Sequence, residues 1–270
     1  MRKLLTCVVI GCLLWSACSE EPVVIPPLGP QSTGDRVVVI EEFTGVKCVN
    51  CPQGSDEIRN LSGLFGDNLA VISIHAGFFS TPYSDSRYDL RTPEGNQIIQ
   101  QLGVPLGYPS AVVNRKQFAG KANLQLGQAE WAGAIREELN NAPQISLSLE
   151  KNYDAASRVL RITAVSVPLE NISGSLRLSV ALTEDGVVDK QLTPEGEKAD
   201  YAHQHVLRIM PTGAEGQALG SLIRGVAQRN TFEWTMPQEW DVEKCKVVAF
   251  VHRAAPEKAV LQAAQVAVLE

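Results

Sequence analysis

The segment that most constrains the fold of this chain is residues 37–52, where a run of apolar, mostly β-branched residues leads into two cysteines spaced C-x-x-C. The run predicts a buried strand over residues 37–43. Apolar residues at helical spacing follow the cysteines and predict a helix over residues 52–65. The sequence therefore predicts a strand, a turn and a helix, with Cys48 and Cys51 at the turn.

This arrangement is typical of thiol–disulfide chemistry. A thiolate at a helix N-terminus faces unpaired N–H groups and the positive end of the helix dipole, which lower its pKa. Lys47 adds a positive charge next to Cys48 in the sequence and favours the thiolate further. We therefore expect Cys48 to be the nucleophile and Cys51 to resolve the mixed disulfide that forms on it.

At further positions the sequence resembles that of the thioredoxin-like superfamily. Its members have a buried acid six residues before the first cysteine, followed by an aromatic residue, and Glu42 and Phe43 stand at those positions. They also have a cis-proline opposite the dithiol, which Pro109 resembles. The resemblance implies that Glu42 exchanges a proton with Cys51 and that Pro109 lets a substrate strand lie beside the dithiol. Lys47 stands where thioredoxins have tryptophan, so the direction of the redox reaction stays open.

The N-terminus has the pattern of a lipoprotein export signal over residues 1–17. Arg2 and Lys3 precede an apolar stretch over residues 4–15, which is too short to serve as a stable membrane anchor. The residues that end this stretch resemble a bacterial lipobox, which implies a lipid on Cys18. The alternative is an ordinary signal peptide that is cut after a small residue.

A tether is expected between the lipid and the folded part of the chain. Residues 18–35 are rich in proline and glycine and cannot form a core, so we expect an extended segment there. Residues 19–22 resemble the acidic tract that directs some lipoproteins to the outer face of the outer membrane in Bacteroides-type bacteria. The protein is therefore expected to be lipid-anchored in the outer membrane and exposed at the cell surface.

Two domains are expected after the tether. Residues 36–142 alternate strands with helices, including a helix at about 127–140 and, near 116–119, an antiparallel partner of the strand that follows Pro109, which predicts an α/β thioredoxin-like domain. Over residues 143–270 the apolar pattern becomes alternating, with turns such as residues 193–196 between short strands. This pattern predicts an all-β sandwich of the immunoglobulin-like type.

The signal, the tether, the C-x-x-C-P segment and the all-β tail together closely resemble one outer-membrane lipoprotein family of Porphyromonas- and Bacteroides-type bacteria. Residues 44–52, 108–115 and 201–208 carry the resemblance. It extends over nearly the whole mature chain. The resemblance implies an outer-membrane location and leaves the reaction open.

Composition and charge argue against several other classes of function. The net charge is −6, and no basic patch suggests binding to nucleic acid. His203 and His205 would share a face on a strand, but no third or fourth ligand stands at a recognisable spacing, so a hydrogen-bonded or surface pair is expected. We therefore expect no metal and no cofactor. His75 is either a neighbour of the cysteine site or a plain strand-end histidine, and Cys245 is expected to be a small buried residue.

Two functions from different classes follow from these observations. The first is thiol–disulfide exchange at the cell envelope, with protein thiols or disulfides as partners and a possible enzymatic role as an oxidoreductase. The second is a surface binding or adhesion protein, in which Cys48 and Cys51 form a structural disulfide. In both cases the lipid on Cys18 would hold the protein at the membrane.

Overall fold

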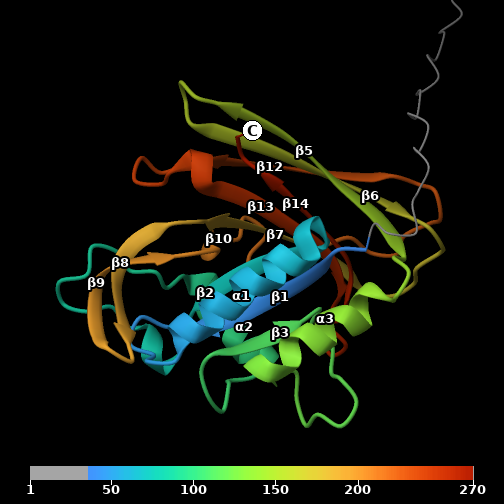
Figure 1. Ribbon diagram of the computed structural model, residues 1–270. Helices are drawn as coiled ribbons and strands as arrows, with labels where there is room; N and C mark the ends of the chain where they lie inside the picture. The colour runs from blue at the N-terminus through green and yellow to red at the C-terminus, as the bar shows by residue number, and fades with distance from the viewer. Residues whose placement is uncertain (1–35, 270) are drawn as a thin grey trace, which may run out of the picture. The chain divides into compact units, whose positions relative to one another are not determined.

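One mixed sheet of nine strands runs through residues 36–269, the part of the chain that the computed structural model describes (Figure 1). Its strands lie in the order β14-β13-β7-β10-β2-β1-β3-β4, and β11 pairs with β7. In chain order they are β1 (Val38–Thr44), β2 (Leu69–His75), β3 (Ser110–Val113), β4 (Leu126–Gly127), β7 (Leu176–Glu184), β10 (Val206–Ile209), β11 (Gln217–Ala218), β13 (Cys245–Arg253) and β14 (Val260–Ala267). The predicted signal peptide, the lipid on Cys18 and the tether fall outside the described residues.

Three α-helices occur in this part of the chain: α1 (Cys51–Phe65), α2 (Pro93–Leu102) and α3 (Trp131–Leu139). Successive side chains of β1 point to opposite faces of the sheet. Val38 and Ile40 pack with residues of α1 and α3, whereas Val39 and Phe43 pack with residues of α2. Because both faces are covered, all seven residues of β1 are buried. None of these helices is both long enough and apolar enough to span a bilayer.

A second sheet of three strands packs against the first. Its strands pair antiparallel in the order β12 (Gln228–Thr235), β6 (Val159–Pro168) and β5 (Ile145–Asp154). Leu160, Ile162 and Ala164 of β6 are buried in one apolar cluster with Leu178 and Val180 of β7. The two remaining strands, β8 (Val187–Thr193) and β9 (Gly196–His203), form a hairpin that is a separate two-stranded sheet.

The expected fold class, an α/β thioredoxin-like domain followed by an all-β sandwich, is wrong. Far more of the described residues lie in strands than in helices, and three helices are too few for such an α/β domain. Strands β7, β10, β13 and β14 also extend the sheet that contains β1 and β2, and β10 runs parallel to β2 where Val206 lies beside Ser73. The predicted boundary near residue 143 falls between α3 and β5. Alternating patterning identifies a strand and its buried face but not its partner strand, which explains the error.

Two local predictions before this boundary also differ from the structure. β3 pairs with β4 and not with a strand near residues 116–119. Asn114 and Arg115 adopt positive φ angles of 47° and 50°, which end the strand and turn the chain. The expected helix at 127–140 begins with a 3₁₀ turn at Gln128–Glu130 before α3. The other 3₁₀ turns in residues 36–269 are Gly66–Asn68, Phe78–Ser80 and Val242–Lys244.

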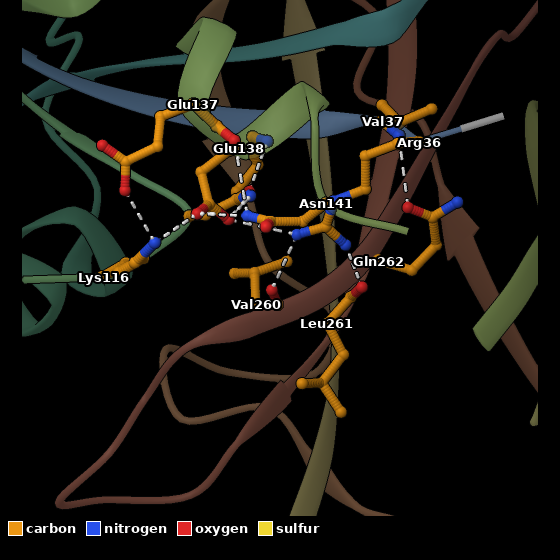
Figure 2. Close-up of polar contacts among 11 residues, drawn as sticks. Arg36, Val37, Lys116, Glu137, Glu138, Asn141, Val260, Leu261 and Gln262 are labelled. Atoms are coloured by element: carbon orange, nitrogen blue, oxygen red, sulfur yellow. Dashed lines mark hydrogen bonds and ion pairs between the residues drawn. The ribbon is translucent and has the colours of Figure 1, made fainter. Parts of the chain in front are cut away.

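A buried arginine at the beginning of the described chain makes polar contacts with segments far away in the sequence (Figure 2). The Arg36 guanidinium forms an ion pair with Glu138, with 3.3 Å between Nη2 and Oε2. It also donates hydrogen bonds to the carbonyl oxygens of Val260, at 3.2 Å, and of Leu261. Arg36 and Glu138 are both buried. The contact therefore joins the chain just before β1 to the end of α3 and the beginning of β14.

Glu138 is the centre of this network (Figure 2). Its carboxylate accepts hydrogen bonds of 2.8 Å from Asn114 and Lys116 and one of 3.0 Å from Asn141. Burial alone would raise the pKa of Glu138, but the hydrogen bonds and the charges of Lys116 and Arg36 lower it overall. The carboxylate is thus kept ionised inside the protein by four donor residues from three different segments.

Candidate functional site

The two cysteines of the C-x-x-C segment form a disulfide where α1 begins. The chain leaves β1, and the Cys48 N–H donates to the Gly45 carbonyl oxygen at 3.0 Å. The Cys51 N–H then donates to the Cys48 carbonyl oxygen at 3.2 Å, and Cys51 is the first residue of the helix. Asn50 at the N-cap makes no side-chain capping bond. The disulfide therefore closes the turn before α1, at the position predicted from the sequence.

Two glycines allow the chain to approach its neighbours closely at this turn. A Cβ atom on Gly45 would lie 2.5 Å from the Phe79 carbonyl group. A Cβ atom on Gly54, in the first turn of α1, would lie 2.6 Å from the Pro109 ring and 3.1 Å from Glu42 Oε1. Real Cβ atoms do not come this close to other heavy atoms, so a larger residue would push these elements apart. The first turn of α1 thus lies directly against both Pro109 and Glu42.

Glu42 is a fully buried acid with an unusual pKa. It lies on β1 beside Ser73 of β2, whose hydroxyl donates to Oε2 at 2.7 Å. In the described structure the other oxygen, Oε1, has no hydrogen-bond partner. Burial raises the pKa of Glu42 to about 7, although the hydrogen bond from Ser73 opposes the shift. At neutral pH this carboxyl can therefore either donate or accept a proton.

Pro109 lies just before β3 and near the first turn of α1, the helix that begins at the disulfide. The Tyr108–Pro109 peptide bond is cis, in agreement with the prediction. Tyr108 donates a hydrogen bond from its hydroxyl to the Ala76 carbonyl oxygen at 3.1 Å, which fixes the loop against the end of β2. Ser110 pairs with Phe43 on β1. The pairing places Pro109 at the end of β1 that leads to the cysteines.

The Lys47 ammonium lies over the ring of Tyr83, with 5.0 Å between Nζ and the ring centroid. Lys190 approaches the same ring at 5.5 Å. Proximity in sequence to Cys48 does not fix the direction of a lysine side chain, and here a cation–π contact holds it. The effect of Lys47 on the Cys48 thiolate stays a prediction.

Both cysteines are covered by the rest of the protein. Cys48 is 3% exposed and Cys51 is 1% exposed. Part of the cover comes from the β8–β9 hairpin, because the side-chain amide of Gln191 donates to the carbonyl oxygens of Cys48, at 3.0 Å, and Gly45, at 3.3 Å. The sequence predicts a turn at residues 193–196 but gives no sign of the role of Gln191, since no local pattern indicates the surface on which a hairpin lies.

The three histidines noted in the sequence, His75, His203 and His205, lie in two different environments. His75, at the end of β2, and His203 are both buried, with ring centroids 5.2 Å apart. Burial lowers the pKa of both rings, that of His203 to about 4, so both are neutral at pH 7. His205 instead contacts the carboxylate of Asp185 at 3.2 Å. The described residues contain no group of three or more His, Cys, Asp or Glu that could hold a metal ion.

Cys245 is fully buried at the beginning of β13 and takes no part in a disulfide. Burial raises the pKa of its thiol to about 12. At neutral pH it is therefore a protonated, unreactive thiol, which confirms the prediction of a small buried residue.

Solved structures with a similar fold include proteins from two bacterial species. HBP35 of Porphyromonas gingivalis superposes with a TM-score of 0.68 and 22% identity, over 87% of this chain and 76% of that chain. A protein from Agrobacterium tumefaciens superposes with a TM-score of 0.54 and 16% identity, over 87% of this chain and 96% of that chain. At these identities the likeness shows the fold alone. A domain of the outer membrane lipoprotein Omp28 from P. gingivalis gives a TM-score of 0.33, with 16% identity over 47% of this chain and 89% of that chain.

The family assignment comes from the sequence itself. No curated protein matches the chain. A profile of the family described as outer membrane protein Omp28 matches residues 96–270, well over half of the chain. The protein therefore belongs to the Omp28 family of outer membrane lipoproteins.

Proposed function

We propose that this protein carries out thiol–disulfide exchange at the cell envelope, with Cys48 and Cys51 as the redox pair. One observation carries the proposal: the disulfide lies at the beginning of α1, and the first turn of that helix packs against the buried carboxyl of Glu42. A pKa of about 7 makes Glu42 an acid and base suited to neutral pH. A disulfide that only holds a loop together has no need of such a group.

The reaction begins from the oxidised pair that the structure contains. A substrate thiolate attacks Sγ of Cys48, the Cys48–Cys51 bond breaks, and Cys51 leaves as a thiolate that takes a proton from Glu42. A second substrate thiolate then attacks the substrate sulfur of the mixed disulfide. The substrate becomes a disulfide and Cys48 leaves as a thiolate. Two electrons pass from the substrate dithiol to the cysteine pair, and the reverse sequence reduces a substrate disulfide.

The α1 N-terminus supports the role of Cys48 as the attacked and attacking sulfur. The positive end of the helix dipole stabilises a thiolate at this position. Pro109 packs against the first turn of α1, so it is proposed to shape the surface along which a substrate chain approaches. Lys47 is proposed to add a positive charge to the region, from its position over Tyr83.

Membership of the Omp28 family places the protein at the outer membrane. Attachment through a lipid on Cys18 and exposure at the cell surface are part of the proposal, on the strength of the lipobox-like sequence and the acidic tract after it. Both features lie outside the described residues. The natural partners would then be proteins with accessible thiols or disulfides in the cell envelope or at its surface.

A second candidate function is supported by a separate observation. Because Cys48 and Cys51 are almost completely buried, the pair also suits a structural disulfide in a surface binding or adhesion protein. Such a disulfide would be hard to reduce and would not form mixed disulfides. The two candidates therefore differ in a measurable property of the same two sulfur atoms.

The reduction potential of the pair, measured by thiol trapping of the mature protein in a series of dithiol buffers, separates these candidates. A potential between about −270 and −120 mV supports exchange, whereas a value below about −300 mV indicates a structural disulfide. Trapping in the envelope provides the second test. Cys51→Ser should accumulate mixed disulfides on Cys48, while the matched variant Cys48→Ser should trap nothing because it lacks the sulfur that the substrate is proposed to attack.

A further inference from the structure

We infer that the β8–β9 hairpin is a movable cover that controls the access of thiols to Cys48, and that Gln191 is the residue that holds it closed. The biological use of such a cover rests on the proposed exchange function. Its existence does not, because access to a disulfide can be measured with a simple chemical reductant.

The base of the hairpin is held by polar contacts with the segment between β2 and α2. The Asp189 carboxylate accepts hydrogen bonds from the backbone N–H groups of Arg87, at 3.2 Å, and Tyr88, at 2.6 Å. The next residue, Lys190, forms an ion pair of 2.6 Å with Asp85. Each contact is between groups that water can also satisfy, so separation exchanges one set of hydrogen bonds for another.

The next two residues of β8 contact the disulfide loop itself. Gln191, which is 2% exposed, donates from Nε2 to the carbonyl oxygens of Cys48 and Gly45. The backbone N–H of Leu192 donates to the Val46 carbonyl oxygen at 2.7 Å. Three carbonyl oxygens of the loop that precedes α1 are thus bonded to one strand of the hairpin. While these bonds are in place, the hairpin covers the disulfide.

Little else holds the far end of the hairpin. Its strands belong to no larger sheet, and β9 is mostly exposed (Figure 1). Val187 at the base is buried in a small apolar cluster, and Tyr201 makes a hydrogen bond with Ser55 of α1. Beyond Tyr201, a cleft of about 550 Å³ separates residues 193–198 from the beginning of α1. The hairpin can therefore move about its base without breaking the main sheet or its core.

Closure matters because disulfide exchange needs room for a third sulfur. The attacking thiolate must approach one sulfur in line with the S–S bond, so exchange depends on access to that sulfur. At 3% exposure Cys48 offers almost no surface to a thiol in the closed arrangement. With such a cover the disulfide is protected while the hairpin is closed, and it becomes reactive when the hairpin opens.

The test compares the rates at which dithiothreitol reduces the Cys48–Cys51 disulfide in the full mature chain and its variants. Gln191→Ala removes the side-chain bonds to the loop and should increase the rate roughly tenfold, the effect expected for the loss of one or two hydrogen bonds. Lys190→Ala loosens the base without touching either cysteine and should increase the rate by a smaller factor. Gln217→Ala, an exposed glutamine on β11, is the control and should leave the rate unchanged.

Hydrogen exchange of residues 187–203 provides a readout that does not involve the disulfide. In both hairpin variants the amide protection of this segment, that of Leu192 above all, should fall by the same factor by which the reduction rate rises. Unchanged rates in both variants would overturn the inference. So would a faster reaction of Gln191→Ala without loss of protection, because Gln191 would then act on the loop alone. Lys190→Ala decides the matter if Gln191→Ala does not fold.

The test of the hairpin cover and the test of the proposed exchange function can succeed or fail independently of each other. If the hairpin variants react faster with dithiothreitol but Cys51→Ser traps no protein partner, the cover exists and the exchange function fails. If partners are trapped but the reduction rates of the variants equal that of the wild type, the exchange function stands and the cover is refuted.

Discussion

Replacing the buried carboxyl of Glu42 by an amide should stabilise the protein in a strongly pH-dependent way. Glu42→Gln keeps the size and shape of the side chain, and the amide oxygen can still accept the hydrogen bond from Ser73. The variant lacks only the ability to ionise. Any difference in stability that changes with pH therefore reports the ionisation of Glu42 in the folded protein.

The magnitude follows from the pKa. Burial raises the pKa of Glu42 from 4.5 to about 7. Between these values the folded protein keeps a proton that the unfolded chain has lost, so the free energy of unfolding falls as the pH rises through this window. Since one pKa unit corresponds to about 1.4 kcal/mol, the full loss above the folded pKa is about 3 kcal/mol. Below the unfolded pKa the carboxyl is neutral in both states and the loss is absent.

Urea unfolding of the oxidised proteins at about pH 4 and about pH 8 measures this effect. Glu42→Gln should be close to the wild type in stability at the lower pH and more stable by about 3 kcal/mol at the higher pH. Gln217→Ala, at an exposed position of β11, changes no ionisable group and is the control, which should show no such pH dependence. An advantage of Glu42→Gln that is the same at both pH values would refute the reasoning, because it would come from packing and not from ionisation.

Three further predictions concern the surroundings of the site. Arg115→Ala leaves the fully buried Glu41 carboxylate without its bidentate partner and should lower the free energy of unfolding by about 3–5 kcal/mol in urea titrations. In α1, Gly54→Ala should destabilise the protein by about 1–3 kcal/mol, because the new methyl group would overlap the neighbouring loop, whereas Gly63→Ala meets nothing and should stabilise it by about 0.5–1 kcal/mol. Cys245 should resist alkylation at pH 8 in the native protein and react fully in denaturant, since its thiol is buried and has a pKa of about 12.

Local elements could be predicted well because their signals are local. The predicted strand at residues 37–43 and the helix at 52–65 match β1 and α1 to within one residue at each end, since a short β-branched run and a 3.6-residue apolar period lie entirely within each element. The position of the two cysteines at the beginning of a helix could also be predicted from the sequence. These predictions needed no knowledge of which elements pack together.

The arrangement of the strands could not be obtained in this way. The apolar residues of β10 indicate a short strand, but not that Val206 lies beside Ser73 in the same sheet as β1. The covering role of the hairpin could not be predicted from the sequence for a similar reason. Gln191 is an ordinary polar residue in an alternating strand, and only its position over Cys48 in the folded chain gives it importance. Likewise, the contact of Lys47 with Tyr83 depends on a loop 36 residues further along the chain.

The two unusual properties of the site have the same physical origin. The packing that buries Glu42 raises its pKa, and the disulfide beside it is buried as well. Above pH 7 the buried carboxyl destabilises the fold by about 3 kcal/mol, and a structural disulfide would gain nothing from that loss. Proton transfer to Cys51 does require an acid whose pKa is near 7, held where water cannot replace it. The energetic penalty of Glu42 therefore favours exchange over a structural role for the same pair of cysteines.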